Sequence, residues 1–263
     1  MNASVRRLRA AGRPLKAILR KVNLIRGAKR CYVCGNTFGK FLPFRDGLRS
    51  SSPFTRALSV VGSDVVNFAC PYCGSTDRLR HIFMYFDRLD FWRRFAGAAI
   101  LHIAAEPGLS ARIEKHGPRL YILGDLGPRP GAQRFDVTAI PYRDKCFDMV
   151  ICNHVLEHVT NDLAALAEFH RVLRPGGYAL LQTPYSSLLA NTFVDPAIDT
   201  DELRSRFYGQ EDHVRLYGRD LFSRIEQSGF RLSTETHAAC LAGIDSSYYG
   251  VNPAEDLILA IRM

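Results

Sequence analysis

The segment from residue 147 to residue 185 constrains the fold of this chain more than any other part of the sequence. Short apolar runs lie near its two ends, at residues 149–152 and 179–181. Such runs are typical of strands in a parallel sheet that is covered on both faces. The segment therefore predicts two buried strands. Between them, apolar residues recur with the 3.6-residue period of a helix, at Leu163, Leu166, Phe169 and Val172.

The same segment marks where its helix begins and ends. Asn161 and Asp162 precede the first apolar position, and both are residue types that favour the N-terminal cap of a helix. Residues 174–177, Arg-Pro-Gly-Gly, follow the last apolar position. Proline and glycine at this point stop a helix, so we expect a turn at these four residues that leads the chain back into the sheet.

The order Phe-Asp, apolar strand, Leu-Glu-His and Leu-x-Pro-Gly-Gly resembles the class I S-adenosylmethionine (SAM)-dependent methyltransferases of the small-molecule, or type 11, kind. The matching residues begin at Phe147 and end at Gly177. The resemblance implies a methyltransferase enzyme, that is, a transferase with SAM as its cofactor. It also implies an α/β fold, a Rossmann-like, doubly wound sheet of seven strands whose last two strands form an antiparallel hairpin. We assign residues 98–263 to this domain.

Four of the seven cysteines occur in two Cys-x-x-Cys-Gly sequences, with Cys31 and Cys34 in the first and Cys70 and Cys73 in the second. Four thiolates suit a tetrahedral zinc ion, and a closed site of this kind is structural because no coordination position is left for water. Redox-active or incidental thiols are the alternative, which the repeated glycine disfavours. We therefore predict a small N-terminal zinc-ribbon module that, with a connecting helix, spans residues 31–97.

The chain between the two cysteine pairs is longer than a minimal zinc ribbon needs. It contains several phenylalanines and a predicted strand at residues 65–69. The insertion is either a substrate-facing loop or a segment that packs against the catalytic domain. Packing is favoured, because exposed phenylalanine side chains are costly. Residues 78–95 are rich in aromatic residues and predict one helix that packs between the module and the domain.

Residues 1–30 form a basic arm. The arm holds ten lysine or arginine residues and no acidic residue, which leaves 35 − 10 = 25 basic against 26 acidic residues in the rest of the chain. Its apolar residues share one face of a predicted helix. Such an arm suits an anionic membrane surface, RNA or an acidic partner, and a solvated helix docked on the domain is the alternative. The sequence has no signal-peptide core or membrane-spanning run, which favours a cytoplasmic protein.

The first strand of the domain, predicted at residues 99–104, leads into the loop that carries glycines in the methyltransferase family. This loop departs from the family pattern, because only one of the three glycines is kept. The resemblance implies that the loop approaches the methionine part of SAM, and glycine permits such an approach. Glu106 would meet the methionine ammonium group. The positions aligned with this part of the family's site are His102, Ala104, Glu106 and Gly108.

Two other strand ends supply the remaining predicted cofactor contacts. A carboxylate after the second strand, here at residues 120–123, binds ribose hydroxyls in nucleotide-binding sheets, although an aspartate that caps a turn is the alternative. The resemblance implies that a following Asp-Val pair contacts adenine. The strand at residues 149–152 ends where the sheet edge opens into a crevice. The corresponding residues are Asp125, Leu126, Asp136, Val137, Asn153 and His154.

Methyl transfer to oxygen or nitrogen is an in-line displacement that usually needs a general base. The candidates for catalysis are His213 and His158. His158 belongs to the Leu-Glu-His sequence, where orienting the helix is an alternative role. His213 lies in a segment where the resemblance implies substrate-facing residues, and anchoring its own loop is the alternative. Residues 186–208, between the fifth strand and the last helix, predict a substrate lid.

Three functions remain open from the sequence. The first is transfer of a methyl group to an oxygen or nitrogen of a small metabolite, a natural product or a glycan sugar. The second is methylation of an rRNA or tRNA base, suggested by a zinc ribbon ahead of a SAM domain and by the basic arm. The third is a non-catalytic adaptor with the SAM fold, which the altered glycine loop permits.

Overall fold

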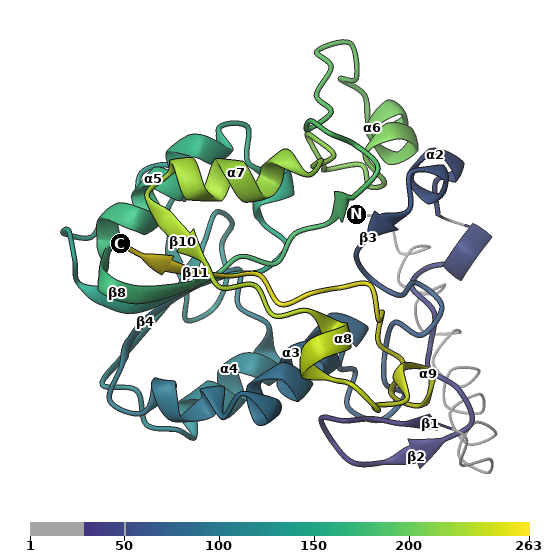
Figure 1. The fold of residues 1–263 in the computed structure, drawn as a ribbon, viewed down its shortest axis with the longest axis horizontal. Coiled ribbons are helices and arrows are strands. Elements are labelled where there is room, and N and C mark those ends of the chain that lie inside the picture. Colours follow the sequence, from purple (N-terminus) through teal and green to yellow (C-terminus); the bar gives the residue numbers. More distant parts are fainter. Residues whose placement is uncertain (1–28, 50) are drawn as a thin grey trace, which may run out of the picture.

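The computed structural model describes residues 29–49 and 51–263, so the predicted basic arm lies outside the described residues except for Lys29 and Arg30. The centre of the molecule is a seven-stranded sheet (Figure 1). In chain order its strands are β4 (Ala99–Ile103), β5 (Leu120–Asp125), β6 (Gln133–Arg134), β7 (Phe147–Cys152), β8 (Leu173–Leu180), β10 (Phe230–Leu232) and β11 (Leu259–Arg262).

The strand order across the sheet is β10-β11-β8-β7-β4-β5-β6. Strands β4, β5, β6, β7 and β8 are parallel to one another, whereas β11 is antiparallel to both β8 and β10. The chain winds outward from β4 through β5 and β6 and then returns to the other side of β4 with β7 and β8. This order confirms the predicted doubly wound sheet and its antiparallel hairpin. The chain runs in one direction across the sheet from β4 and in the other direction from β7, so the topological switch point lies between β4 and β7.

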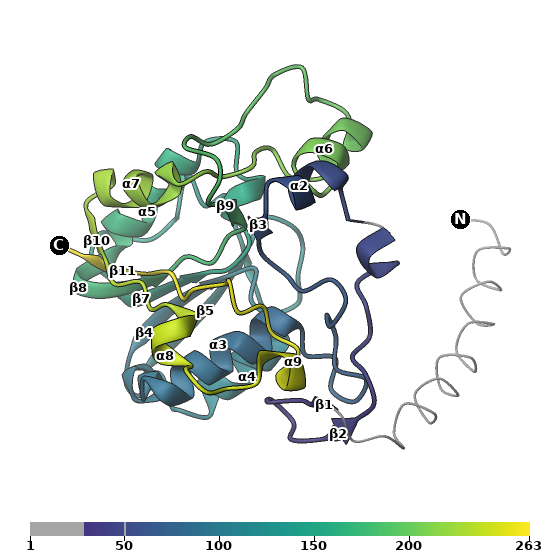
Figure 2. The same ribbon diagram turned by 45° about the vertical axis from the view of Figure 1, so that its right-hand side comes forward.

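Helices cover both faces of the sheet, as Figures 1 and 2 show. One face carries α5 (Asp162–Val172) and α7 (Asp220–Gln227). The other carries α3 (Asp77–Arg88) and α4 (Pro107–Glu114). None of the described helices is both long and apolar enough to cross a membrane.

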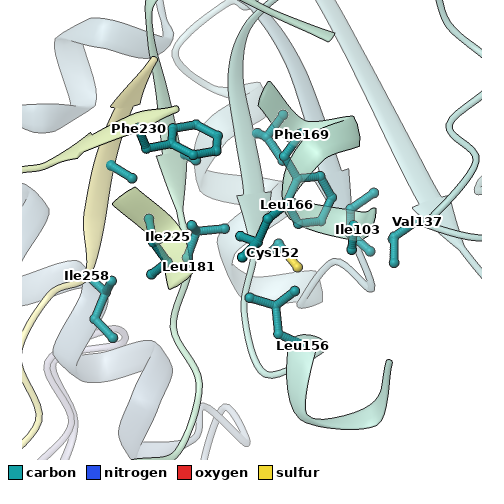
Figure 3. Close-up of a cluster of buried hydrophobic side chains, with 14 of the residues drawn as sticks. Ile103, Val137, Cys152, Leu156, Leu166, Phe169, Leu181, Ile225, Phe230 and Ile258 are labelled. Atoms are coloured by element: carbon teal, nitrogen blue, oxygen red, sulfur yellow. The ribbon is translucent and has the colours of Figure 1, made fainter. Parts of the chain in front are cut away.

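Alternate side chains of the central strands enter two separate apolar cores. In β7, Val150 and Cys152 belong to the core beneath α5 and α7, whereas Met149 and Ile151 belong to the core beneath α3 and α4. This alternation follows from the two-residue period of a strand, and it explains why the sequence of β7 is apolar throughout. Figure 3 shows the first core, where side chains of the helices meet those of the strands.

Shorter elements surround the sheet. The pairing of β3 with β9 joins the insertion between the two cysteine pairs to the chain that follows β8. In both views α2 lies beside α6 above this pairing. The elements are β1 (Lys29–Arg30), β2 (Thr37–Phe38), η1 (Gly47–Arg49), α2 (Pro53–Ala57), β3 (Val60–Val61), η2 (Phe91–Phe95), η3 (Leu156–His158), β9 (Tyr185–Ser186), α6 (Asp201–Phe207), α8 (His237–Cys240) and α9 (Ser246–Tyr249).

The predicted start of α5 is confirmed, and the turn predicted after it lies within the first half of β8 as an irregularity of the strand. The Asn161 side chain caps the helix by accepting a hydrogen bond from the Ala164 N–H at 3.1 Å. Residues 174–177 lie inside β8, which begins directly after the helix at a point where its register against β7 is irregular. Gly176 has the left-handed φ of 76°, and a Cβ on Gly177 would lie 2.9 Å from the Arg174 carbonyl oxygen, so both glycines are needed where these four residues loop out between Leu173 and Tyr178.

Two predictions for the N-terminal region are also corrected. The strand at residues 65–69 is absent from the described chain because the Asp64 side chain accepts hydrogen bonds from the Val66 and Asn67 N–H groups, each at 3.0 Å, and so forms a turn. The helix predicted over residues 78–95 is two helices, α3 and η2. They are separated at Asp90, which has the left-handed conformation with φ 51° that aspartate tolerates.

Candidate active site

A cavity of about 660 Å³ opens at the carboxyl ends of β4, β5 and β7, next to the switch point of the sheet. Cofactor sites in open parallel sheets lie at this edge, and the volume falls in the usual range for small-molecule sites. Its wall brings together six of the ten predicted cofactor residues, namely Ala104, Asp125, Leu126, Asp136, Val137 and His154.

Asp125 ends β5 with a carboxylate that has room for further donors. Its Oδ1 accepts a hydrogen bond from the Gly127 N–H at 3.0 Å, and its Oδ2 lies 3.6 Å from Nη1 of Arg129. The side chain is 25% exposed. A carboxylate offers about four lone-pair positions, so two contacts leave capacity for two hydroxyl groups. The turn contact to Gly127 and a ribose contact are therefore compatible.

Asp136 and Val137 form another part of the same wall. The Asp136 Oδ1 accepts hydrogen bonds from the backbone N–H and the hydroxyl group of Thr138, both at 2.8 Å. These bonds fix the orientation of the carboxylate. Val137 is buried and belongs to the core beneath α5, so it gives the cavity a rigid apolar floor.

The other four predicted cofactor residues do not line this cavity. His102 is fully buried in β4, with Nδ1 2.8 Å from the Tyr121 hydroxyl and Nε2 3.1 Å from Oε2 of Glu106. The amide of Asn153 donates to Oε1 of Glu106 at 3.4 Å. Burial acts to raise the pKa of Glu106, but the bond to His102 outweighs it and the pKa is lowered. A direct contact of these residues with SAM stays a prediction.

Gly108 has a packing role in the described structure. A Cβ at this position would lie 2.6 Å from the Cδ2 atom of Leu79. Glycine therefore lets α4 pack closely on α3, on the face of the sheet that carries both helices. Its predicted contact with the cofactor is not seen in the cavity wall.

The two predicted catalytic histidines lie together beside the cavity. The rings of His158 and His213 are edge to face, with centroids 4.8 Å apart. Nδ1 of His158 lies 3.1 Å from the carbonyl oxygen of Asp212 and 3.4 Å from its carboxylate. His158 lines the 660 Å³ cavity, whereas His213 lies behind it at 4% exposure. The pairing of these residues across 55 positions of sequence places both at one site.

The geometry of His213 fixes its tautomer. Nδ1 of His213 is 3.0 Å from the carbonyl oxygen of Tyr208, which only accepts, so Nδ1 carries the proton. Nε2 is buried and has no hydrogen-bond partner among the described residues. Burial lowers the pKa of His213, so the ring is neutral near pH 7 and Nε2 presents a lone pair. This is the form that a general base requires.

His154 lies at the end of β7 between two buried carboxylates. Its Nδ1 is 3.4 Å from Glu157 and its Nε2 is 3.8 Å from Glu255. Burial acts to lower the pKa of His154, but the two carboxylates outweigh it and the pKa is raised. Glu157 also accepts a hydrogen bond from the Thr183 hydroxyl at 2.8 Å, and despite burial its pKa is lowered to about 2 by His154. The three groups therefore form a charged, buried cluster.

A smaller cavity of about 150 Å³ adjoins the first, and His154 lines both. Glu157 and His213 line it from the catalytic domain. Its other wall comes from the insertion between the cysteine pairs, including Gly62 and Ser63, and from Arg78 at the start of α3. The sequence favoured packing for this insertion, and the structure shows that it also lines a cavity.

The sequence did not identify Arg78 or Glu255 as site residues. Arg78 follows the second cysteine pair, and Glu255 lies near the C-terminus, more than 90 residues after His154. Neither residue lies in a recognisable motif. Only the packing of the N-terminal and C-terminal segments around the sheet edge brings them to the site, so no local signal was present.

The four predicted zinc ligands form one cluster. Their sulfur atoms all lie within 4.8 Å of one another, with 3.7 Å between Cys31 and Cys73 and 3.8 Å between Cys34 and Cys70. In a tetrahedral site with Zn–S bonds of about 2.3 Å, neighbouring sulfurs lie about 3.8 Å apart. The four thiols are free of disulfides. The donor set and its spacing therefore fit a zinc ion.

The two halves of this cluster have the same backbone geometry. Gly35 and Gly74 both have φ of 73°, a left-handed conformation that favours glycine. Their N–H groups donate to the carbonyl oxygens of Cys31 and Cys70, at 2.9 and 3.0 Å. The repeated Cys-x-x-Cys-Gly sequence therefore builds the same turn twice.

Comparison with known proteins agrees with the strand order. Residues 91–181 match the family model described as a methyltransferase domain, which is about a third of the chain. The chain is 39% identical over 46 residues to the ubiquinone/menaquinone biosynthesis C-methyltransferase UbiE of Coxiella burnetii, covering 18% of each protein. It is 41% identical over 61 residues to the demethylmenaquinone methyltransferase of Mycobacterium tuberculosis, covering 22% of this chain and 26% of that one. The matched region thus spans about a quarter or less of these relatives.

Among solved structures, an S-adenosylmethionine-dependent methyltransferase from Mesorhizobium loti superposes with a TM-score of 0.48 and 18% identity, covering 67% of this chain and 96% of that one. A methyltransferase from Listeria monocytogenes gives a TM-score of 0.44 and 12% identity, covering 69% and 99%. The fold assignment accordingly stands on the strand order and the family match. The seven-stranded order and the cavity at its switch point describe a doubly wound α/β domain, and residues 91–181 within it match the model of a methyltransferase domain.

Proposed function

We propose that this protein transfers the methyl group of SAM to an oxygen or nitrogen atom of a small acceptor, such as a metabolite, a natural product or a glycan sugar. The observation that carries this proposal is the unpartnered Nε2 of His213, which is buried beside the cavity that fits a cofactor. An oxygen or nitrogen nucleophile must lose a proton during methyl transfer, and this nitrogen can accept it. The 150 Å³ cavity, which His213 lines, would hold the acceptor.

The 660 Å³ cavity supplies the groups that SAM binding requires. Asp125 would accept hydrogen bonds from the ribose hydroxyls, and Asp136 would accept one from the adenine amino group. Val137 would contact the adenine ring, and His154 lies where the two cavities meet. When bound, SAM supplies a methyl group on a sulfonium, which needs no further activation. The protein's own contribution is therefore to position the acceptor and to remove its proton.

His213 is the proposed catalytic base. Its Nδ1–H is held by the Tyr208 carbonyl, which directs the Nε2 lone pair to the other side of the ring. The edge of the neighbouring His158 ring, which Asp212 holds in place, would keep the imidazole from rotating. His158 is thus a positioning residue in this proposal, and removal of the proton is assigned to His213.

The same four-cysteine cluster that fits zinc by its sulfur spacing is proposed to bind a structural Zn2+. Cys31, Cys34, Cys70 and Cys73 would all be ligands, which leaves no position for water. The hydroxyl of Ser75 lies 3.1 Å from the Cys31 sulfur and 3.2 Å from the Cys73 sulfur, so it would donate its one hydrogen bond to one of these two thiolates.

The experiment that tests the proposed function is transfer of tritiated methyl groups from SAM into an extract of the host cell. We expect counts in the small-molecule or glycan fraction that survive ribonuclease. The His213→Ala variant should bind SAM as the wild type does and lose about 100-fold or more of the transfer rate. Transfer by His213→Ala at the wild-type rate would refute the base assignment.

Two other outcomes would replace the proposal. Ribonuclease-sensitive counts in the macromolecular fraction would favour an RNA base methyltransferase, for which the cysteine cluster and the basic arm are the supporting features. The curated relatives include a C-methyltransferase by name, so a product methylated at carbon would overturn the assignment of the acceptor atom. SAM binding with no transfer to any fraction would favour the adaptor.

A further inference from the structure

The acceptor cavity continues into a third cavity of about 130 Å³, and Arg78 lines both. Thr55, Ser63 and Gln210 are also shared between the two. They come from the insertion between the cysteine pairs and from the chain that follows α6. The two segments are joined by the hydrogen bond from Ser52 to the Arg206 carbonyl and by the contact of Phe54 with Phe207, whose ring centroids are 5.3 Å apart. Together they enclose a space beside the catalytic histidine.

Arg78 lines this space, and its guanidinium group has no ion-pair partner among the described residues. It is half-buried at the start of α3, and its guanidinium makes no hydrogen bond or ion pair with any residue of the described chain. Arg80, two residues further along the same helix, donates to five carbonyl oxygens. An arginine carries five N–H donors, and those of Arg78 make no hydrogen bond within the described chain, so its guanidinium has the capacity to bind a ligand.

The two carboxylates that feel the charge of Arg78 form no ion pair with it, although one buried oxygen of Asp77, Oδ1, has no hydrogen-bond partner among the described residues. Arg78 acts to lower the pKa of Asp77 and of Glu106, so its charge lies near both. Asp77 accepts a hydrogen bond from the Asp64 N–H, and Glu106 is bonded to His102. The positive charge of Arg78 also acts to lower the pKa of His154. Arg78 therefore lies near His154, the residue at which the 660 Å³ and 150 Å³ cavities meet.

The rest of the lining offers donors and little negative charge. The Ser63 hydroxyl and the Gln210 side-chain amide make no hydrogen bond to another described residue. Both residues line the two cavities. The carboxylate in the 150 Å³ cavity is Glu157, which is 1% exposed and bonded to Thr183 and His154. A neutral or cationic ligand would leave the Arg78 charge uncompensated in a half-buried space, which is costly.

We propose that the methyl acceptor carries an oxyanion, a carboxylate or a phosphate, and that Arg78 binds this group. The guanidinium presents its donors in a planar fork that matches two oxygens of such an anion. Ser63 and Gln210 would supply further hydrogen bonds to it. This inference rests on the proposed function, because it assigns the cavity to the acceptor. It adds that the anion is held by Arg78, which lines the 150 Å³ and 130 Å³ cavities but not the 660 Å³ cavity, while His213 also lines the 150 Å³ cavity.

The proposal is tested with two simple anions, inorganic phosphate and acetate, titrated into the SAM-loaded full-length protein by calorimetry. The variants are Arg78→Gln, which removes the charge, and Arg78→Lys, which keeps it without the fork. The control is Arg93→Gln on η2, whose side chain is 84% exposed and lies outside both cavities. The basic arm is present in all of these proteins, so the difference between variants isolates the cavity.

We expect the wild type and Arg93→Gln to bind at least one of the anions with equal affinity. Arg78→Gln should bind it at least tenfold more weakly, with Arg78→Lys in between, and all four proteins should bind SAM equally. A preference for phosphate over acetate would identify the acceptor as a phosphate ester, and the reverse would identify a carboxylate. Equal anion binding by Arg78→Gln and the wild type, or no anion binding by the SAM-loaded wild type, would overturn the proposal. Failure of every protein to bind SAM would instead count against the proposed function.

Discussion

Arg80 is expected to be one of the most sensitive positions for stability in this protein. Its side chain is 0% exposed, and its guanidinium donates hydrogen bonds to the carbonyl oxygens of Asn67, Phe68, Ser75, Tyr249 and Gly250. It also lies 3.9 Å above the centre of the Phe41 ring. Arg80 thus connects the second cysteine pair to the C-terminal segment. Replacing it with methionine keeps the apolar stem and removes all of these hydrogen bonds.

The loss of stability depends on which of the five carbonyl oxygens still accept a hydrogen bond from another donor. The Phe68 and Ser75 carbonyls also accept from the backbone N–H groups of Asp77 and Cys70. The other three carbonyls have no second donor among the described residues. A buried group left without a partner costs about 1–3 kcal/mol. Part of this loss is offset, because the variant no longer pays the desolvation penalty of a buried charge. For Arg80→Met we therefore expect a loss of about 3–5 kcal/mol in the free energy of unfolding.

The measurement is urea unfolding of the purified protein, supported by thermal unfolding. A loss of this size should lower the melting temperature by roughly 2–4 °C for each kcal/mol. The control is Arg88→Met on the same helix, where the exposed side chain donates a single hydrogen bond to the Cys240 carbonyl at 3.2 Å. We expect less than about 1 kcal/mol there. If Arg80→Met were as stable as Arg88→Met, the three carbonyls would have other partners and the reasoning would be refuted.

Three further predictions concern the cofactor, the metal and acid stability. Asp125→Ala should weaken SAM binding at least tenfold by calorimetry, and an unchanged affinity would remove Asp125 from the ribose site. Cys70→Ser, or a strong chelator, should unfold the N-terminal module with release of zinc, and a well-folded, metal-free protein would contradict the structural role. The folded-state pKa of Glu157, about 2, lies below its ordinary value of 4.5, so its stabilising effect is complete above about pH 4.5 and is lost as the pH falls towards 2. Between about pH 4.5 and 2, the free energy of unfolding should therefore fall more steeply for the wild type than for Glu157→Gln. Identical pH dependence of the two proteins would contradict the proposed stabilisation of the Glu157 carboxylate by His154.

The parts of the fold that depend on local sequence were predictable. The start of α5 follows from the Asn161 cap and the period of its apolar residues, and the hydrogen bond to the Ala164 N–H confirms it. The strands β4 and β7 follow from buried apolar runs, and β5 follows from an apolar run that is mostly half-buried. The cysteine cluster follows from a repeated five-residue pattern that forms the same turn twice. In each case, the information lies within a few residues of the feature.

The parts that depend on distant contacts were not predictable from one sequence. The apolar residues at 65–69 have the composition of a strand, but the Asp64 side chain satisfies the local N–H groups and the predicted strand does not form. Arg78 reaches the site only because α3 packs on the sheet. The wall of the acceptor cavity depends on contacts between residues far apart in the chain, such as the Ser186 hydroxyl and the Leu58 carbonyl, which are 128 positions apart. No periodicity or motif marks such pairs.

The pairing of β3 with β9 has a consequence for how this protein could have diversified. The segment between the cysteine pairs is hydrogen-bonded to the chain that follows β8, and Val60 of β3 and Pro184, next to β9, both line the 150 Å³ cavity. A recombination event that exchanged residues 98–263 alone would leave behind the part of this cavity wall that comes from the N-terminal module. If the cavity binds the acceptor as proposed, the N-terminal module and residues 186–208 are expected to be inherited together, and a change of acceptor would require matched substitutions in both.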